Sequence, residues 1–291
     1  MVVIDSDVGD DIDDAYAITW ALRSPALDVR AIMVSFGDTA LRAQLVRRML
    51  DVLGRSDVVV VRGAPTPSGT VFSQAAWARD GRQGGTASLA FVARLIRRHP
   101  NRVTLIALGP LGDVAGLRRL DPAAFGKLGR ILAMGRSIRL GYGQTEATVA
   151  PKPSAEYNVV QDPAALRDVL ASGVPVTLFP LDSTQIKLTS SDEAGLVATS
   201  NATTAMLEAL TTEWRANNAR GQKVPILFDA VPVAAAIDAT LCPARPKAIK
   251  VDDRGLTRVV EGPANALVCL NVEHRLVISR LIADVDREPY R

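Results

Sequence analysis

The chain has 291 residues, of which 48% are hydrophobic, and its formal net charge is only +3. This composition supports a large buried core and excludes a disordered chain. Its positive residues are scattered over expected helices without interleaved aromatics, which argues against a nucleic-acid partner.

No apolar run is long enough to cross a bilayer, and the first residues lack the pattern of a cleavable signal peptide. We therefore expect no membrane partner and a cytoplasmic location. The chain has two cysteines, Cys242 and Cys269, which could pair with each other. Because two cysteines make no disulfide framework in a chain of this size, we expect buried thiols.

Apolar strand-like runs alternate with helical patterns from the first residues onward. Strands are expected at residues 2–5, 29–36, 58–63, 103–109, 131–135 and 175–182. Helices are expected at residues 15–22, 43–54, 88–98, 114–120 and 163–173. A hairpin at 248–260 follows, and then a strand that leads into a helix within 265–282. Such alternation predicts an α/β fold with an open, mostly parallel sheet and helices on both faces.

We see no linker or internal repeat, so we predict one domain over residues 1–291. In folds of this kind, functional residues gather at the carboxyl ends of the strands. Asp7, Asp38, Met134 and the stretch 109–112 fall at such ends. Two segments rich in Gly, Ser and Pro, residues 68–88 and 136–157, also lie beside strand ends, and each could be an active-site loop or an ordinary surface excursion.

The stretch DSDVGDDIDDA, residues 5–15, holds six aspartates on the expected turn from the first strand into the first helix. Helix N-termini favour acidic side chains, but that preference explains one or two aspartates, not six. If the strand persists, Asp5 and Asp7 share a face. An outward-facing cup of carboxylate oxygens suits a hard cation such as Ca²⁺ or Mg²⁺. A solvated acidic turn is the alternative.

Several motifs together resemble the inosine-uridine nucleoside hydrolase family. They are DSDVGDDIDDA, FGD, ALGPLGDVA, AMG, AEYNVVQDP, PLDSTQ and LFDAV, in this order along almost the whole chain. The resemblance implies an open α/β sheet fold and cleavage of the N-glycosidic bond of a ribonucleoside with the help of bound Ca²⁺. It also implies a small-molecule nucleoside or riboside as substrate, and a homodimer or homotetramer.

The resemblance also implies roles for individual residues. Asp7 would bind the metal and take a proton from the attacking water, and Asp14 would be a bidentate ligand. Asp229 and the backbone carbonyl of Gly112 would complete the protein ligands. The residues on the sugar side would be Asp13, Asp38, Met134, Glu156 and Asn158.

This chain departs from the family pattern in ways that bear on the leaving group. Two extra residues lengthen the acidic motif, and Phe228 stands where many members have a histidine that can protonate the departing base. The chain has only two histidines, His99 and His274, and for each we expect a structural or surface role. We expect leaving-group activation from stacking, ordered water, an easily departing base or a nearby side chain. The candidate side chains are Trp77, Arg136, Tyr142 and Tyr157.

Two other functions share features with this sequence. A DxD motif after a first strand also occurs in haloacid-dehalogenase phosphatases, but the late acidic motif of that family is missing. A ribose-binding protein that kept the metal cup and lost turnover would also account for Phe228 and Asp38.

Overall fold

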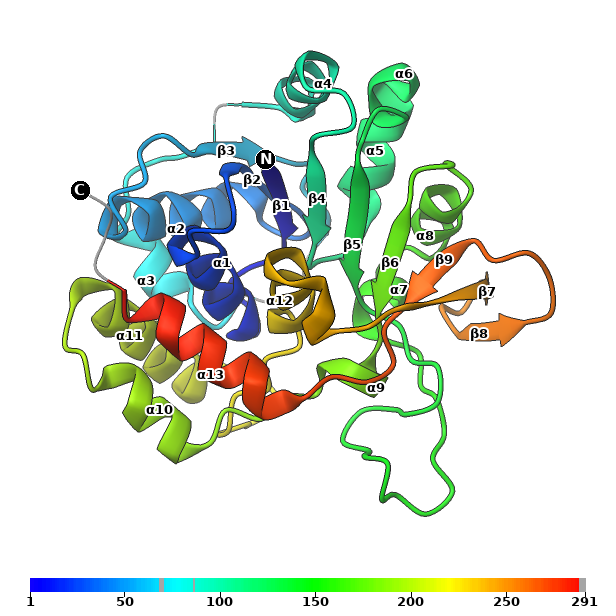
Figure 1. The fold of residues 1–291 in the computed structure, drawn as a ribbon. Coiled ribbons are helices and arrows are strands. Elements are labelled where there is room, and N and C mark those ends of the chain that lie inside the picture. Colours follow the sequence, from blue (N-terminus) through cyan, green and yellow to red (C-terminus); the bar gives the residue numbers. More distant parts are fainter. Residues whose placement is uncertain (68–70, 86, 288–291) are drawn as a thin grey trace.

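A computed structural model describes residues 1–67, 71–85 and 87–287 of the chain. The strands are β1 Val2–Ser6, β2 Val29–Val34, β3 Val59–Arg62, β4 Thr104–Ala107, β5 Arg130–Met134, β6 Val176–Phe179, β7 Arg245–Val251, β8 Thr257–Val260 and β9 Ala266–Val268. They form one sheet in the order β3-β2-β1-β4-β5-β6-β9-β7-β8. All neighbouring pairs from β3 to β9 are parallel, whereas β7 runs antiparallel to both β9 and β8. The predicted open, mostly parallel α/β sheet is confirmed (Figure 1).

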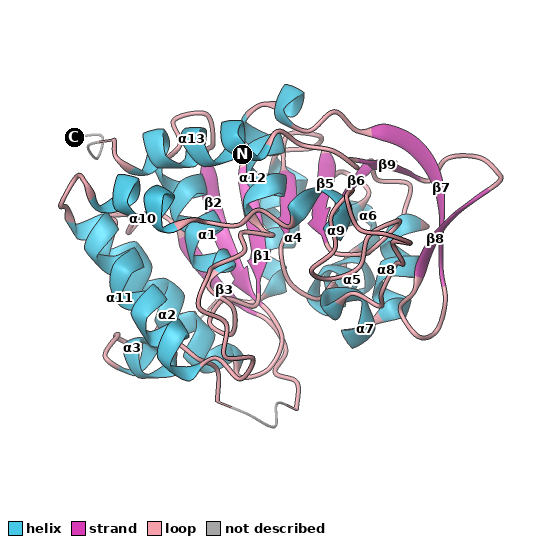
Figure 2. Ribbon diagram, turned by 90° about the horizontal axis from the view of Figure 1, so that it is seen from below, coloured by secondary structure: helices cyan, strands magenta, loops and turns pink. Residues whose placement is uncertain are grey.

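Helices cover both faces of this sheet (Figures 1 and 2). One face carries α1 Asp13–Arg23, α2 Thr39–Val52, α11 Ala202–Asn217, α12 Ala230–Ile237 and α13 His274–Val285. The other carries α4 Leu89–Arg98, α5 Gly112–Leu120, α6 Pro122–Phe125 and α8 Pro163–Leu170. The shorter elements are α3 Ala75–Arg79, α7 Tyr157–Gln161, α9 Leu181–Thr184, α10 Ser190–Val197 and the 3-10 turn η1 Ala239–Leu241.

The direction of winding reverses at β1. From β1 the chain moves outward to β2 and β3, and then returns to place β4 on the other side of β1. Ile4 consequently pairs with Ile32 of β2 and with Ile106 of β4. In open parallel sheets, such a reversal leaves a crevice at the carboxyl ends of the two central strands, where ligands bind. Asp7 follows β1 at this point and Leu108 follows β4.

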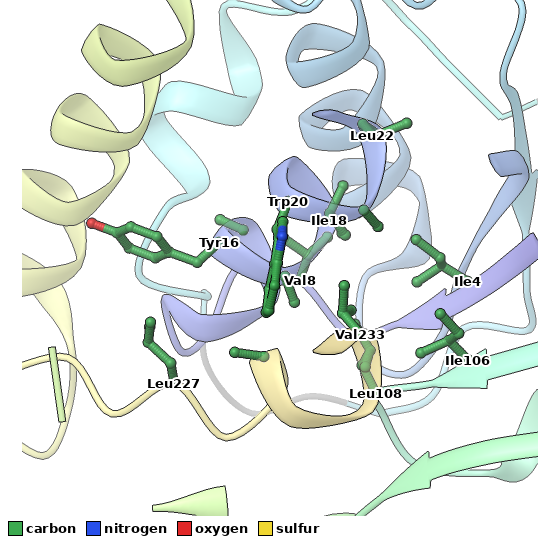
Figure 3. Packing of buried hydrophobic residues seen from close by; sticks show 14 of the residues in the cluster. Ile4, Val8, Tyr16, Ile18, Trp20, Leu22, Ile106, Leu108, Leu227 and Val233 are labelled. Atoms are coloured by element: carbon green, nitrogen blue, oxygen red, sulfur yellow. The ribbon is translucent and has the colours of Figure 1, made fainter. Parts of the chain in front are cut away.

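The helices that border this crevice are held by a core of buried apolar side chains. Figure 3 shows Ile18 and Trp20 of α1 close to Val233 of α12, with Ile4 and Ile106 of the sheet alongside. Trp20 also donates an indole hydrogen bond to Asp284 of α13 at 3.0 Å. Close packing of this kind leaves little room for α1 and α12 to shift.

The prediction of free thiols is wrong, because Cys242 and Cys269 form a disulfide. Cys242 follows η1 and Cys269 follows β9, and their Cα atoms are 5.8 Å apart, a separation that a disulfide spans without strain. Both cysteines are buried, as expected. The bond ties the end of α12 to the chain that enters α13.

One other expectation differs from the structure, namely that Asp5 and Asp7 share a face of the first strand. The strand ends at Ser6, so Asp7 does not continue it; Asp5 is fully buried and does not line the crevice pocket. The apolar run before Asp229 is not a strand, since only Ile226 forms an isolated bridge, with Lys187. It is a short crossing segment whose Leu227 amide donates to Ile186 before α12 begins.

A buried arginine holds in place the acidic turn, residues 7–12 between β1 and α1. Arg42 of α2 is 1% exposed, and its guanidinium donates to the carbonyls of Phe36, Asp7 and Val8 and to the carboxylate of Asp10 at 2.6 Å. The planar, five-donor guanidinium is suited to holding several oxygens at once. The sequence offered no signal for this residue, which lies in a helix that reads as an ordinary amphipathic one.

A second set of contacts holds the turn from the segment just before α3. Gly9 has φ +127°, and the Phe72 ring lies where a side chain at position 9 would be. The Ser73 hydroxyl donates to the carbonyls of Gly9 and Asp10, and Gln74 donates to the carbonyl of Asp11 at 2.7 Å. The predicted loop 68–88 thus supports the acidic turn from behind, although residues 68–70 and 86 lie outside the described part.

The substitution Arg42→Met should destabilise the protein by about 3–5 kcal/mol, because it leaves buried carbonyls and Asp10 without their cation. Urea unfolding measures this change. The matched control is Arg30→Met, which removes an ion pair to Asp28 that is half exposed on both sides and should cost about 0–1 kcal/mol. Equal losses in the two variants would show that Arg42 does not hold the turn.

Candidate active site

A pocket lies at the carboxyl ends of the central strands. Its volume of about 200 Å³ is below the roughly 300–1,000 Å³ typical of drug-sized ligand sites, so it suits a compact ligand. Its lining comes from the acidic turn, the ends of β4 and β5, the loop before α7, the end of α11 with the following loop, and the start of α12. The lining residues are Asp7, Asp10, Asp11, Asp13, Asp14, Leu108, Met134, Tyr142, Glu156, Tyr157, Asn158, Trp214, Asn218, Ala219, Arg220, Gln222, Phe228 and Asp229.

Three buried carboxylates meet inside this pocket. Asp13, Asp14 and Asp229 each place an oxygen within 4.8 Å of the others. Asp13 and Asp14 lie in the first turn of α1, and Asp229 is the N-cap residue of α12. Two helix N-termini therefore face the same point, and their positive ends favour negative side chains there. The Ser6 hydroxyl donates to Asp14 at 2.5 Å and fixes one of the carboxylates.

Asp7 lines the same pocket beside this trio. A Cβ atom at position 109 would lie 2.7 Å from Asp7 Oδ1, so the glycine at this position allows the carboxylate to pack against the end of β4. Asp14 repels the charge on Asp7 and Arg42 attracts it. Asp7 therefore lies close enough to Asp14 and to Arg42 for both to influence the charge on its carboxylate.

The buried carboxylates of this cluster repel one another, and a bound cation would stabilise their charged forms. Burial, and then repulsion among neighbouring carboxylates, raises the pKa of Asp7, Asp13 and Asp229 well above the usual value. Burial also raises the pKa of Asp14, to about 6, against the opposing effects of Ser6 and Arg42. Desolvated carboxylates of this kind either take up protons or bind a positive charge. An all-oxygen donor set fits a hard cation such as Ca²⁺.

On the sugar side expected from the resemblance, Met134, Glu156 and Asn158 line the pocket together. Asn158 donates to the carbonyl of Leu108 at 2.5 Å. Glu156 is the N-cap residue of α7, and its carboxylate accepts from the backbone amides of Arg136, Asn158 and Val159 and from the hydroxyl of Tyr142. These hydrogen bonds fix the segment that carries Asn158.

Three expected site residues lie elsewhere. Gly112 starts α5 and is not among the lining residues; Leu108 does line the pocket, and its carbonyl accepts a hydrogen bond from Asn158. Asp38 is exposed, and its carboxylate caps α2 by accepting from the amides of Ala40 and Leu41. Trp77 is on α3, where its ring stacks on the guanidinium of Arg48 at 4.1 Å.

Two of the side chains considered for leaving-group activation reach the pocket, namely Tyr142 and Tyr157. The ring of Tyr142 packs edge-on against Phe228, with centroids 6.0 Å apart. Arg136 is buried behind β5, where its guanidinium donates to the carbonyls of Ala133 and Met134. Neither histidine is among the described residues that line the pocket.

One side of the pocket was not predicted from the sequence. Trp214, near the C-terminal end of α11, lines the pocket. The polar loop that follows this helix contributes Asn218, Arg220 and Gln222. Asn218 folds this loop by bonding to both the amide and the carbonyl of Gln222, at 2.8 and 2.9 Å. The short polar run between α11 and the crossing segment was the available signal, but nothing in it pointed to chemistry.

None of the helices in the described ranges has the length and apolar character that a bilayer span requires.

Comparison with known proteins agrees with this geometry. The chain is 36% identical over 200 residues to the pyrimidine-specific ribonucleoside hydrolase RihA of Salmonella arizonae, and 34% identical over 198 residues to RihA of Klebsiella pneumoniae. Both matches cover 63% of this chain, which spans about 60% of the length of those relatives.

Solved structures show the same fold over nearly the whole chain. A plant nucleoside hydrolase, PpNRh1, superimposes with a TM-score of 0.81 at 24% identity, covering 99% of both chains. A purine-preferring ribonucleoside hydrolase from Gardnerella vaginalis gives a TM-score of 0.82 at 22% identity, covering 98% of both chains. The sequence model described as inosine-uridine preferring nucleoside hydrolase matches residues 2–279. The chain therefore belongs to the inosine-uridine preferring nucleoside hydrolase family.

Proposed function

We propose that this protein hydrolyses the N-glycosidic bond of a ribonucleoside or related riboside and releases ribose and the free base. The observation that carries the proposal is the meeting of Asp13, Asp14 and Asp229 with Asp7 in one pocket at the end of β1 and β4. The family match argues against the phosphatase alternative.

The ion proposed for this site is Ca²⁺. We propose that Asp7, Asp14 and Asp229 hold it, and that the carbonyl of Leu108 takes the place first assigned to Gly112. Asp13, which belongs to the buried trio, would contribute either to the ion or to a sugar hydroxyl. A bound hard cation supplies Lewis acidity, which makes water a better nucleophile at neutral pH.

The side chains of this pocket would act as follows. Asp7 takes the proton from the attacking water. As the C–N bond breaks, positive charge develops on the sugar, and the surrounding carboxylates stabilise it. Asn158, held through Leu108, and the segment capped by Glu156 orient the sugar so that water and the anomeric carbon meet in a fixed geometry.

Further features of the proposal come from the sequence. One domain over residues 1–291 accords with the single sheet. A homodimer or homotetramer and a role without nucleic acid stay predictions. A cytoplasmic location also stays a prediction, and the disulfide between Cys242 and Cys269 weighs against it, since disulfides are uncommon in reducing compartments.

The function is tested by a panel of ribosides with reducing-sugar detection, which does not depend on the identity of the leaving group. Chelator-treated protein should release no sugar, and added Ca²⁺ should restore the release. If chelator-treated protein retained full activity, the metal would have to be removed from the proposal. If no riboside gave sugar with Ca²⁺ present, a ribose-binding role without turnover would replace hydrolysis.

Ca²⁺ should raise the thermal midpoint more at about pH 7.5 than at about pH 5. The raised pKa values of Asp7, Asp13 and Asp229, and of Asp14 at about 6, mean that these groups bind protons more tightly when folded. Their favourable contribution to metal-free stability is therefore present at low pH and is lost as the pH rises through the folded-state values. Bound Ca²⁺ offsets that loss, so a Ca²⁺ effect independent of pH, measured by thermal unfolding, would contradict this account.

The substitutions Asp7→Ala and Glu156→Ala should produce different kinetic defects. Asp7→Ala removes the proton acceptor and should abolish turnover, whereas Glu156→Ala loosens the segment that orients the sugar and should mainly raise KM. Steady-state kinetics on an activated riboside distinguish the two effects. Near-normal turnover in Asp7→Ala would require another residue to activate the water.

With Phe228 in place of a proton donor, activity should be poor on inosine and uridine and much better on p-nitrophenyl riboside, whose leaving group departs without protonation. General acid assistance typically contributes about 10²–10⁴-fold, which sets the scale of the difference. The substitution Phe228→His should narrow that gap in kcat. Comparable wild-type rates on inosine and the activated riboside would mean that Tyr142 or Tyr157 supplies the proton.

A further inference from the structure

The resemblance implies that Glu156 holds a sugar hydroxyl, but its carboxylate is already fully hydrogen-bonded within the chain. Its Oε1 accepts from the amide of Asn158 at 3.0 Å and from the hydroxyl of Tyr142 at 3.2 Å. Its Oε2 accepts from the amides of Arg136 and Val159, at 2.9 and 3.3 Å. Each carboxylate oxygen has about two lone-pair sites, so these hydrogen bonds fill them. Glu156 is also only 2% exposed, and it therefore supports the groups around it without a free acceptor for a ligand.

The hydroxyl of Tyr142, which lines the pocket, can meet a ligand in place of Glu156. It donates its proton to Glu156 and accepts from the amide of Tyr157 at 3.0 Å. Among the described residues no further hydrogen bond reaches this oxygen, so it can accept one more. Burial, and then the charge of Glu156, raises the pKa of the Tyr142 phenol, which therefore keeps its proton at neutral pH.

The two ends of the Tyr142 side chain lie against different parts of the pocket. Its ring packs edge-on against Phe228, at the position where the resemblance implies a residue close to the departing base. Its oxygen lies beside Glu156 and the amide of Tyr157, at the start of the helix α7 that carries Asn158. The oxygen therefore belongs to the sugar side of the pocket, where a hydroxyl is the ligand group that suits a free acceptor.

Gln185 fixes the backbone on both sides of Tyr142. Tyr142 belongs to the long loop between β5 and α7 (Figure 1) and is 40% exposed, so burial alone does not hold it. The side-chain oxygen of Gln185 accepts from the amide of Gly143 at 2.6 Å. Its side-chain nitrogen donates to the carbonyls of Gly141 and Gln144, at 3.2 and 3.0 Å. Gln185 is not among the residues that line the pocket, so it acts on a ligand through the loop that carries Tyr142.

We propose that Tyr142 is a substrate-contacting residue whose phenol oxygen accepts a hydrogen bond from a hydroxyl of the sugar, and that Gln185 is the positioning residue that holds it there. The inference rests on the proposed riboside hydrolysis and deepens it, because it assigns a sugar contact to Tyr142 and a supporting role to Glu156. A neutral hydrogen bond of this kind should change kcat/KM by about threefold to tenfold.

The test uses p-nitrophenyl riboside and its 2-deoxy, 3-deoxy and 5-deoxy analogues, with the Ca²⁺-loaded full chain. The readout for each hydroxyl is the ratio of kcat/KM between the intact riboside and the analogue that lacks it. Tyr142→Phe removes only the phenol oxygen, so the ratio for one hydroxyl should fall by about threefold to tenfold, while the other two ratios keep their wild-type values. A general loss of activity, which weaker support of Glu156 would cause, leaves these ratios unchanged.

Gln185→Leu should raise KM for the intact riboside and change kcat much less, because it frees the loop without removing a group from the pocket. In a Tyr142→Ala background the same substitution should have no further effect on KM, since no phenol is left to be positioned. The matched control is Gln44→Leu, which removes a single side-chain hydrogen bond to the carbonyl of Gly81 outside the pocket. This control should keep wild-type kinetics.

Three results would overturn the inference. Rates lowered equally by Tyr142→Phe, with all ratios unchanged, would show that the phenol only supports Glu156. An effect of Tyr142→Phe on uridine and inosine but not on p-nitrophenyl riboside would place its contact at the base. A rise in KM caused by Gln185→Leu that persists in the Tyr142→Ala background would show that Gln185 acts elsewhere.

Failure of the proposed function is a separate outcome, in which wild-type protein cleaves no riboside at all. Calorimetric Kd ratios for the same riboside and deoxy analogues would then replace the rate ratios. Equal Kd ratios in wild-type protein and Tyr142→Phe would overturn the contact, whereas a smaller ratio for one hydroxyl in Tyr142→Phe would support it in a protein that binds ribosides without turnover.

Discussion

Repulsion among buried carboxylates is the constraint on which this structure depends. Four aspartates, Asp7, Asp13, Asp14 and Asp229, are almost removed from water in one pocket. Uncompensated, such an arrangement would be strongly destabilising. The positive charge of Arg42, which binds the backbone of the acidic turn, offsets part of this negative charge. The positive ends of α1 and α12 offset another part. What remains is the affinity for a cation, which we propose is used for catalysis.

The same constraint explains why the surrounding elements are packed so tightly. Val8, Leu108 and Leu227, each close in sequence to a pocket carboxylate or carbonyl, belong to the core cluster that joins α1 to α12 (Figure 3). Movement of either helix would separate the carboxylates and lose the site. The disulfide after η1 and the Trp20–Asp284 hydrogen bond restrain the same helices from their far ends.

The fold and the centre of the site could be predicted because their signals are local. Alternating apolar runs predicted β1 to β6 and the helices α1, α2, α4, α5 and α8 between them, and the acidic motif located the pocket. Signals for α10 and α11 were present but unused, since Thr189 and Asn201 each form a capping box. A capping box can be recognised from the spacing of its two side chains.

The remaining features depend on contacts between distant segments, which one sequence does not show. Nothing in α2 singled out Arg42, and nothing in residues 218–222 indicated that this loop would close the pocket. Asp38 was misplaced for a related reason, because a residue after a strand can either face the crevice or cap the next helix. The Phe36–Gly37 turn, where both φ values are positive, directs Asp38 to the start of α2 and not into the crevice. Gly112 and Leu108 lie at the two ends of the short loop between β4 and α5, and the sequence does not show which of them reaches the pocket.

The central claim is that the buried acid cluster is a cation site, and a crystal structure grown with Ca²⁺ tests it most directly through the anomalous signal of the ion. The account predicts one ion bound at about 2.3–2.6 Å from oxygens of Asp7, Asp14 and Asp229 and from the carbonyl of Leu108. An ion bound only elsewhere, or a pocket with no ion at saturating Ca²⁺ near neutral pH, would contradict it.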